Sequence, residues 1–505
     1  MKIVRENILV LFILSIGAFL RLYRIADYMT FLGDEGRDVL VVKRLIVNFD
    51  IPFIGPTASV GGFFLGPLYY YLMAPFLWLF RLSPVGPAVM VALFGIATIY
   101  LVYLSGRIFF NKNAAYMAAS LYALSPLVIS YSRSSWNPNL VPFFSLLLIF
   151  SLFQSVKTGK KIWFFLCGVS LGAGMQFHYL FLFLFPPLII FVFLERKKLN
   201  LGKFIFLSLS GFMLFMFPFI AFELKNHFPN TKTIYQFLLS GKEISAASEN
   251  WRVKLFNIIF RLFARLVFFY PAPEQLERFG KTRLFFWNLS IITSIISSFV
   301  LLIFQSVKKK QVQSVLLLLW WFFGVGLFYF YHKQIYDYYL GIMFALPFLL
   351  LGNLLSEIAQ MRILKPLIFL GVVSLIILNW SGRPFIYEPN RQFKQTETVS
   401  RFVFGQAGGE PFNFALLTNS NSDHAYRYFF EIWGMPPVII ENEEKDPERK
   451  TVADQLLVIC EMDDCKPLGH PLWEIAGFGR AEIVFESRVG YLKIFKLVHL
   501  KEELK

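Results

Sequence analysis

Four charged residues, Asp34, Glu35, Arg37 and Asp38, lie in one short stretch directly after the first long apolar segment of the chain. Carboxylates beside a lipid bilayer are costly, and they usually mark a functional site. Water reaches a position just past the hydrocarbon, so an ionised Asp34 can stay basic there while a lipid-borne substrate lies within reach. The position suits a general base that acts on a substrate carried by a membrane lipid.

The composition sets the class of protein that must position these residues. The 505 residues are 56% hydrophobic, 18% aromatic and only 16% charged, and long apolar runs recur along the chain. Such runs are typical of transmembrane helices, so we predict an all-α polytopic membrane protein. The formal net charge of +16 comes largely from short basic clusters between the apolar runs. This pattern indicates membrane topology and contact with membrane lipids, and it gives no reason to expect nucleic acid as a partner.

Eleven apolar segments are predicted to cross the membrane. They are Asn7–Leu22, Val85–Arg107, Ala114–Tyr131, Pro138–Val156, Ile162–Phe177, Tyr179–Leu194, Phe204–Phe222, Leu284–Phe304, Val315–Tyr331, Tyr339–Leu355 and Pro366–Trp380. With this count the basic loops, among them Lys157–Lys161 and Lys308–Lys310, fall on one side, which the positive-inside rule makes cytoplasmic. We therefore expect a plasma (inner) membrane protein with a cytoplasmic N-terminus and an extracytoplasmic C-terminal domain.

Residues 1–380 are predicted to form the transmembrane domain, and its first outer loop, 23–65, contains the acidic stretch. Within this loop Glu35–Val47 has the residue mix of a helix on the membrane surface, and a glycine- and proline-rich return follows it. The next apolar segment, Gly66–Leu82, is short and contains two prolines, and counting it as a span would reverse every later loop. We expect it to be an interfacial or re-entrant helix.

A second outer loop, 223–283, contains a predicted amphipathic helix at Trp251–Phe269. Arg261 and Arg265 are four residues apart and therefore share one face of this helix. Helices of this kind lie in the headgroup plane of a membrane. The two arginines either bind phosphate or form a solvated basic face, and the sequence supports the two readings equally.

The tail, 381–505, has a soluble composition and is predicted to be a small α/β domain outside the membrane. Strands are expected at Phe412–Thr418, Val438–Glu441, Leu456–Cys460, Ile483–Glu486 and Tyr491–Leu497, and helices at Thr396–Phe404 and His424–Ile432. Cys460 and Cys465 lie in this domain, where an oxidising environment permits a disulfide. A local disulfide and two free thiols are both open at this point.

The predicted outer face gathers acids, cations and aromatic rings. Asp34 and Glu35 are the candidate catalytic residues, and the candidate substrate-binding residues are Arg37, Arg133, Trp136, Asn137, His178, Tyr179, His332 and Tyr338. Glycosyl transfer from a lipid phosphate needs these groups: a carboxylate takes the proton of the acceptor hydroxyl, a cation stabilises the leaving phosphate, and aromatic rings stack on the sugar. The sequence shows no Walker loop, HExxH, CxxC, GxSxG or Rossmann motif. We predict no metal-ligand residues, and a divalent cation stays open as a cofactor.

Several motifs together resemble the dolichyl-phosphate-mannose protein mannosyltransferase family, which includes the bacterial aminoarabinose transferase to lipid A and has the GT-C fold. They are Gly33–Asp38, Gly66–Tyr71, Ser125-Pro126 leading to Tyr131–Arg133, and Tyr338-Tyr339. The resemblance covers roughly residues 1–360. It implies an inverting transfer of a mannose-like sugar from a polyprenyl-phosphate donor to a hydroxyl of a lipid, glycan or protein acceptor.

Within this resemblance Asp34 takes the place of the catalytic base and Glu35 that of the second acid, while Arg133 and His178 stand near the expected donor phosphate. The chain departs from the lipid A enzymes at three places. Leu65-Gly66-Pro67 stands where they have Glu-Lys-Pro, Asn137 where they have Asp, and His178 where they have Lys. These departures weigh against a lipid A acceptor.

Two other functions remain as alternatives. One is an oligosaccharide or polymer ligase with a lipid-diphosphate donor, and the other is a lipid or sugar transporter. A transporter is expected to carry polar groups near the membrane midplane, whereas charge in this chain gathers at the predicted outer surface. Asp34 also has a purely structural explanation, because a carboxylate at the start of a helix meets the positive end of the helix dipole.

Overall fold

The computed structural model describes residues 2–58, 61–240, 250–331 and 333–500. It contains two compact units: Met1–Ile25, Ile51–Phe76 and Gly86–Glu388 form the first, and Ala26–Asp50, Leu77–Val85 and Pro389–Lys505 form the second. The acidic stretch therefore folds with the C-terminal part of the chain. The predicted domain boundary at residue 380 stays a prediction.

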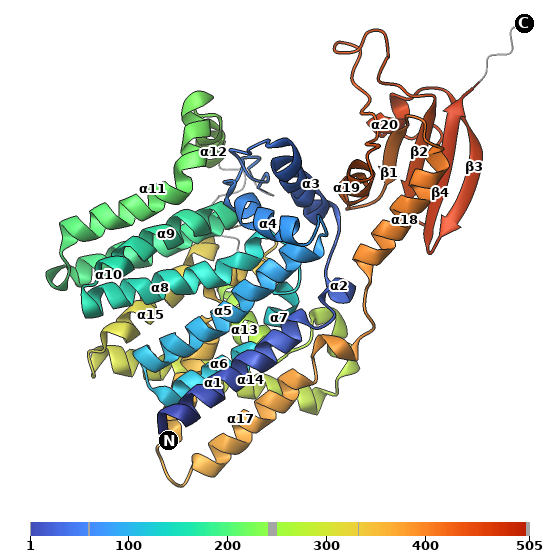
Figure 1. Cartoon of the computed structure of the whole chain (residues 1–505). Helices are drawn as coiled ribbons and strands as arrows, with labels where there is room; N and C mark the ends of the chain where they lie inside the picture. Colours follow the sequence, from blue (N-terminus) through green and yellow to red (C-terminus); the bar gives the residue numbers. More distant parts are fainter. Residues whose placement is uncertain (1, 59–60, 241–249, 332, 501–505) are drawn as a thin grey trace, which may run out of the picture. The chain divides into compact units, whose positions relative to one another are not determined.

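The first unit is a bundle of helices (Figure 1). They are α1 (Lys2–Leu22), α4 (Leu68–Leu79), α5 (Val85–Phe109), α6 (Lys112–Leu124), α7 (Pro126–Tyr131), α8 (Val141–Thr158), α9 (Lys161–Phe177), α10 (Phe185–Leu194), α11 (Leu201–Lys225), α12 (Pro229–Ser240), α13 (Trp251–Leu266), α14 (Lys281–Val307), α15 (Val312–Gly326), α16 (Leu346–Ile358) and α17 (Lys365–Trp380). Short 3₁₀ segments precede α8, α10 and α16. The predicted amphipathic helix is α13.

Five described helices are long and apolar enough to cross a membrane, and a bent pair that ends in α16 would make a sixth. Shorter apolar helices coincide with four further predicted spans, and α4 coincides with the segment expected to be interfacial. The predicted span Ala114–Tyr131 is interrupted, because α6 ends at Leu124 and α7 begins with Pro126. Proline has no N–H to continue the ladder of the preceding helix. The prediction of a mostly helical polytopic protein agrees with this architecture, and the count of eleven spans stays a prediction.

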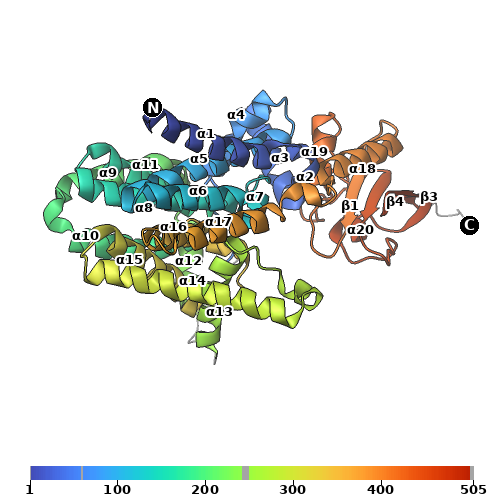
Figure 2. The same cartoon turned by 90° about the horizontal axis from the view of Figure 1, so that it is seen from below.

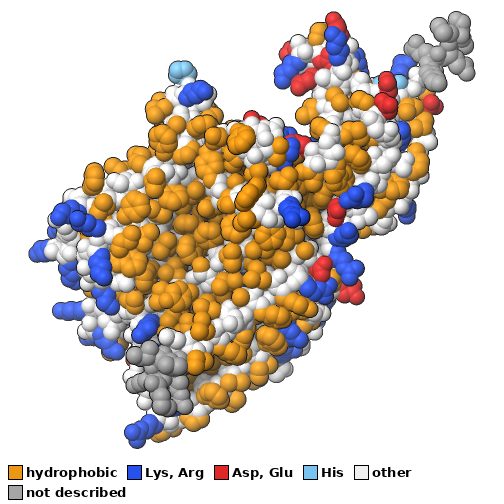
Figure 3. All heavy atoms as spheres, viewed as in Figure 1, with side chains coloured by type: hydrophobic (Ala, Val, Ile, Leu, Met, Phe, Trp, Pro, Cys, Tyr) orange, Lys and Arg blue, Asp and Glu red, His pale blue; other side chains and the backbone are white. Residues whose placement is uncertain are grey.

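Burial within the bundle shows which helices are central. The apolar window of the α8 span is 78% buried inside the protein, whereas those of α11 and α14 are only 17% and 22% buried. In Figure 2, α14 and α15 lie side by side along one side of the bundle. Hydrophobic side chains cover much of the face of the bundle drawn in Figure 3, and Lys and Arg side chains gather towards its edges. A helix with so much exposed apolar surface is stable in lipid and not in water.

The second unit is built around a four-stranded sheet in the order β1-β2-β4-β3. The strands are β1 (Asn413–Leu417), β2 (Gln455–Cys460), β3 (Ala481–Val489) and β4 (Leu492–His499), and the helices are α2 (Ile25–Tyr28), α3 (Gly33–Asn48), α18 (Gln392–Ala407), α19 (His424–Ile432) and α20 (Trp473–Ala476). β1 and β2 are parallel, while β2–β4 and β4–β3 are antiparallel. The helices α18 and α19 cover one face of the sheet through Val399, Val403 and Phe430. The other face packs against Ile475 of α20.

Most elements predicted for the tail are present, and α19 has the predicted bounds. The predicted strand Val438–Glu441 is wrong, because only an isolated bridge joins Val438 to Asn413. The side chain of Asn413 bonds the carbonyl of Val438 (2.8 Å) and takes the place of a further ladder bond. Cys460 and Cys465 are joined by a disulfide, which settles the question left open by their spacing.

Candidate active site

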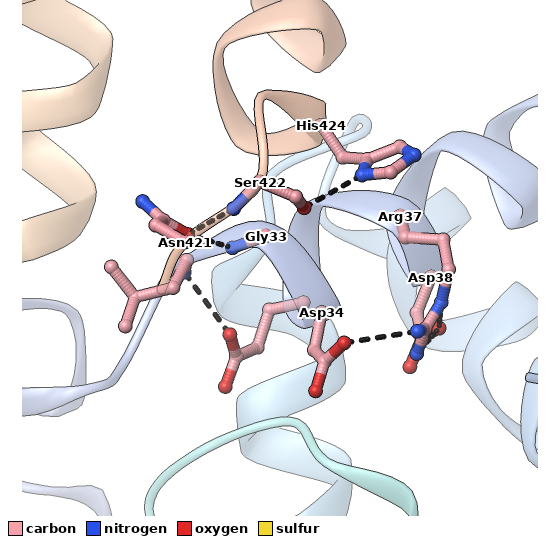
Figure 4. Close-up of polar contacts among 9 residues, drawn as sticks. Gly33, Asp34, Arg37, Asp38, Asn421, Ser422 and His424 are labelled. Carbon is pink, nitrogen blue, oxygen red and sulfur yellow. Dashed lines mark hydrogen bonds and ion pairs between the residues drawn. The ribbon is translucent and has the colours of Figure 1, made fainter. Parts of the chain in front are cut away.

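The acidic cluster, defined as Asp34, Glu35, Arg37 and Asp38, forms the first turns of α3. Asp34 is accessible, with 56% of its side chain exposed, and its Oδ1 accepts a hydrogen bond from Arg37 Nη1 at 2.9 Å. Arg37 also bonds the buried carboxylate of Asp38 through Nη2 at 2.8 Å. Figure 4 shows the Asp34 carboxylate directed towards Arg37 at the start of the helix. One arginine thus orients two carboxylates, of which Asp34 is open to a reactant.

Glu35 occupies a different environment from its neighbour Asp34. Its side chain is only 6% exposed, and its carboxylate accepts the backbone N–H of Leu32 at 3.0 Å. This bond satisfies one of the N–H groups at the helix start. Burial raises the pKa of Glu35 to about 7, and the charges of Asp34 and Asp38 add to the rise, although the bond from Leu32 opposes it. The observed contact of Glu35 is that of a helix cap, and its assignment as the second acid stays a prediction.

The raised pKa of Glu35 predicts a pH-dependent stability. Because the pKa in the folded state lies above the unfolded value, the stabilisation is complete below about pH 4.5 and is lost as the pH rises through about 7. Glu35→Gln keeps an acceptor for Leu32 and removes the titration. We expect the free energy of unfolding of the purified wild-type protein to fall between pH 5 and pH 8 by roughly 3 kcal/mol more than that of the variant, which is measured as a larger fall in melting temperature. The control is Glu482→Gln, which changes an exposed carboxylate of β3. If the melting temperature falls equally with pH in the wild type, the variant and the control, this account is contradicted.

A polar turn after β1 contacts the start of α3, and no pattern in the sequence predicts this contact. Asn421 Oδ1 accepts the backbone N–H of Gly33 at 2.9 Å, and Ser422 Oγ lies 2.8 Å from His424 Nδ1 (Figure 4). Burial lowers the pKa of His424. The run Thr418–Asp423 was readable as a loop from its polar residues. Nothing in a local pattern shows which distant helix such a loop touches.

An aromatic cluster in the first unit gathers several of the predicted substrate-binding residues. The ring centroids of Trp136 and Tyr338 are 4.5 Å apart, those of His178 and Tyr179 are 4.6 Å apart, and those of His178 and Tyr338 are 5.8 Å apart. The ring of Tyr339 lies edge-on to that of Tyr338, with the two ring centroids 4.5 Å apart. The turns before α8, α10 and α16 supply these rings, so the cluster is an assembled surface. Aromatic faces of this kind stack on sugar rings.

Hydrogen bonds fix the turns that supply the aromatic cluster. Asn137 is buried, and its Nδ2 donates to the carbonyl of Phe177 at 2.7 Å. His178 is also buried, and its Nδ1 accepts the N–H of Leu180 at 3.2 Å. An imidazole nitrogen that accepts a hydrogen bond carries no proton, so the ring is neutral in this arrangement. The predicted role of His178 beside the donor phosphate stays a prediction.

Arg133 is buried among backbone carbonyls at the end of α1. Only 2% of the residue is exposed. Its Nη1 donates to the carbonyl of Leu20 at 2.7 Å, and its Nη2 donates to those of Tyr23 at 2.8 Å and Arg24 at 3.2 Å. The guanidinium therefore caps the C-terminal end of α1, where helical carbonyls lack intrahelical partners. The predicted contact with the donor phosphate stays a prediction.

The two arginines of α13 form a charged cluster with Asp337. Arg261 Nη2 lies 2.5 Å from Asp337 Oδ1, and Arg265 Nη2 lies 3.2 Å from Oδ2. Arg261 also donates to the carbonyl of Ile335 at 2.8 Å. Since one carboxylate faces two guanidinium groups, the cluster keeps a net positive charge, which favours an anion. Both readings of Arg261 and Arg265 stay predictions.

An apolar cavity of about 370 Å³ opens in the first unit. Its lining comes from the glycine-rich return, from helices α9, α11 and α12, and from the 3₁₀ segment Leu327–Phe330 that follows α15, and it includes Tyr179, Tyr331 and Lys333. The hydroxyls of Tyr179 and Tyr331 are 3.3 Å apart, which joins the cavity wall to the aromatic cluster. Pockets that are apolar with a few polar groups at one end bind amphipathic ligands.

His332 lies outside the described residues. Among the residues that the structure describes, no three His, Cys, Asp or Glu side chains are grouped as metal ligands. Arg37 forms ion pairs with both Asp34 and Asp38, so a protein cation already faces these two carboxylates. A divalent cation as cofactor stays a prediction.

Comparison with known proteins agrees with the predicted resemblance. Residues 65–222 match the family described as dolichyl-phosphate-mannose-protein mannosyltransferase. A 95-residue segment, 18% of this chain, is 34% identical to 13% of the "Putative mannosyltransferase YkcB" of Bacillus subtilis (strain 168), and a 137-residue segment, 27% of the chain, is 24% identical to 20% of the "Putative mannosyltransferase YycA" of the same organism. The chain thus spans about a fifth or less of the length of these relatives. The acidic stretch lies outside the range matched by the family.

Solved structures cover far more of the chain. ArnT from Cupriavidus metallidurans bound to undecaprenyl phosphate superimposes with a TM-score of 0.63 at 11% identity, over 96% of this chain and 97% of that one. The oligosaccharyltransferase AglB from Archaeoglobus fulgidus, in complex with an inhibitory peptide and a dolichol-phosphate, gives a TM-score of 0.54 at 13% identity, over 90% and 69%. At these identities the likeness concerns the fold. The chain has the GT-C fold, and its residues 65–222 resemble the dolichyl-phosphate-mannose-protein mannosyltransferases.

Proposed function

We propose that this protein is an inverting glycosyltransferase that moves a mannose-like sugar from a polyprenyl-phosphate donor to an acceptor hydroxyl at the outer face of the membrane. The observation that carries the proposal is the accessible Asp34 carboxylate, oriented by Arg37 at the start of α3, in a chain with the GT-C fold. The relatives named as mannosyltransferases and the undecaprenyl phosphate bound to ArnT support this class of donor and sugar.

In the proposed reaction Asp34 accepts the proton of the acceptor hydroxyl. The hydroxyl oxygen forms a bond to the anomeric carbon, and the bond from that carbon to the phosphate oxygen breaks. The polyprenyl phosphate leaves with the bonding electrons, and attack from the opposite side inverts the anomeric centre. A carboxylate suits the first role because it can accept a proton within hydrogen-bond reach.

The first unit contains groups suited to the donor. The apolar cavity matches a prenyl chain, and the rings of the aromatic cluster match a sugar face. The net positive cluster of Arg261, Arg265 and Asp337 suits the phosphate, since cations stabilise the charge that develops on a leaving group.

The donor class can be tested with two labelled lipids. Membranes with and without the protein are incubated with radiolabelled mannose carried on polyprenyl monophosphate or on polyprenyl diphosphate. We expect protein-dependent loss of label from the monophosphate lipid and release of free polyprenyl phosphate. Consumption of the diphosphate lipid alone would favour the ligase, and movement of intact donor across sealed vesicles without cleavage would favour the transporter.

The proposed outer location of the acceptor requires a fixed topology. We predict that position 309 is cytoplasmic and that position 420 is external, because the basic loops leave no other consistent alternation. Lys309→Cys and Ser420→Cys are compared in a background without Cys167, in intact and in permeabilised cells, with a membrane-impermeant thiol reagent. Label should reach position 420 in intact cells and position 309 only after permeabilisation. The opposite pattern would reverse the topology.

A further inference from the structure

We infer that the C-terminal sheet domain is part of the catalytic apparatus, with Asn421 as a positioning residue for Asp34. This inference rests on the proposed function of Asp34. The side chain of Asn421 accepts the N–H of Gly33, the first residue of α3 (Figure 4). The N–H groups of the first helical turn lack partners within the helix, so an external acceptor fixes where the helix begins. Asp34 is the next residue.

The carboxylate of Glu461 sets the orientation of the Asn421 side-chain amide. Its Nδ2 donates to both carboxylate oxygens of Glu461, at 3.1 and 3.2 Å. Glu461 also accepts the hydroxyl of Tyr426 at 2.8 Å, and its own N–H donates to the carbonyl of Leu417 at 2.8 Å. Because the carboxylate takes the NH₂ end of the amide, the oxygen end must face Gly33. Glu461, the residue after β2, therefore holds the acceptor in place and is itself bonded to Leu417, the last residue of β1.

Steric contact reinforces this alignment. A Cβ added to Gly33 would lie 2.0 Å from Ser422 Oγ, and one added to Gly36 would lie 2.3 Å from the backbone nitrogen of Ala425. The two glycines that flank Asp34 and Glu35 in the sequence thus let α3 approach the turn and the start of α19 closely. The Gly-Asp-Glu-Gly spacing serves this contact as well as the chemistry of the acids.

The expected consequence concerns the rate of the chemical step. A general base must lie within hydrogen-bond reach of its proton, and misplacement by about 1 Å can cost on the order of 100-fold. Loss of the Asn421 acceptor frees the start of α3 without touching the donor-binding groups of the first unit. We expect Asn421→Ala to lower kcat for sugar transfer by about tenfold or more, and to change the KM for the donor by less than about twofold.

A polarity swap tests whether the hydrogen bonds, and not the fold alone, carry the effect. Asn421→Asp keeps an acceptor for Gly33 but sets a second carboxylate against Glu461, so it should be impaired. Adding Glu461→Gln lets the new amide donate to the new carboxylate and still accept from Tyr426, so the double variant should recover most of kcat. Asn419→Ala, an exposed change in the same turn, is the matched control.

Amide hydrogen exchange at residues 33–38 gives a readout that needs no donor. We expect faster exchange in Asn421→Ala and near-normal exchange in the double variant and in Asn419→Ala. We call the hydrogen bond from Gly33 to Asn421 the clamp. Unchanged exchange at residues 33–38 in Asn421→Ala, or exchange in the double variant that stays fast, would overturn the clamp. Faster exchange with an unchanged kcat would overturn its role in catalysis. Absence of transfer by the wild-type protein would count against the proposed function and leave the exchange result as the test of the clamp.

Discussion

Asp34→Asn is expected to lower turnover by roughly 100-fold or more while the protein stays folded and binds its donor. The substitution keeps the size of the side chain and an oxygen that can accept from Arg37 Nη1, but the amide cannot take a proton. Because the side chain is 56% exposed, little of the folding energy depends on it. The measurement is kcat for transfer from a polyprenyl-phosphate sugar, together with the melting temperature and the donor Kd.

The matched control for this prediction is Asp50→Asn, which removes an exposed carboxylate just beyond the end of α3. Its kcat should be close to that of the wild type. Near-normal transfer by purified Asp34→Asn protein would show that the carboxylate is only a helix cap. A loss of transfer that is matched by a large fall in melting temperature would also count against the role of a base.

The sequence was sufficient for features that depend on local pattern. Apolar length predicted the helices of the bundle, because every backbone group that crosses a bilayer must be satisfied within its own segment. The glycine- and proline-rich return was also expected, and the structure shows it folded back with Gly55 N–H bonded to the carbonyl of Leu65 at 2.7 Å. Short apolar runs predicted the four strands of the sheet domain, together with a fifth at Val438–Glu441 that does not form.

The contacts that organise the candidate site lie beyond such patterns. Gly33 and Asn421 are separated by 388 positions, and a polar loop has the same composition whether or not it meets a helix. Asp34 and Glu35 were both predicted to be catalytic because they are adjacent acids. In the structure Asp34 is exposed and Glu35 is buried, a difference that the sequence does not show. Local propensity fixes elements, whereas the environment of each side chain comes from tertiary packing.

The contacts of Arg133 also could not be predicted from the sequence, and replacing this residue is expected to have a large effect on stability. Its position on a short turn predicted that it would bind the donor phosphate. In the structure it bonds backbone carbonyls, and every residue has one, so the sequence does not show which carbonyls a side chain will meet. Arg133→Ala would leave the carbonyls of Leu20, Tyr23 and Arg24 without this donor. A buried acceptor left without a partner costs about 1–3 kcal/mol, and Leu20 is buried while Tyr23 and Arg24 are exposed, so we expect the free energy of unfolding to fall by about 1–3 kcal/mol.

Transfer by Arg133→Ala is expected to fall with stability, and Arg133→Lys should recover only part of both, because lysine lacks the planar fork that reaches several carbonyls at once. Donor binding separates the two roles of this residue. If Arg133 also holds the donor phosphate, added polyprenyl phosphate should raise the melting temperature of the wild type and of the exposed control Arg362→Ala by more than that of Arg133→Ala. An equal rise in all three proteins would assign Arg133 to the end of α1 alone, and an unchanged melting temperature of Arg133→Ala without ligand would contradict its role there.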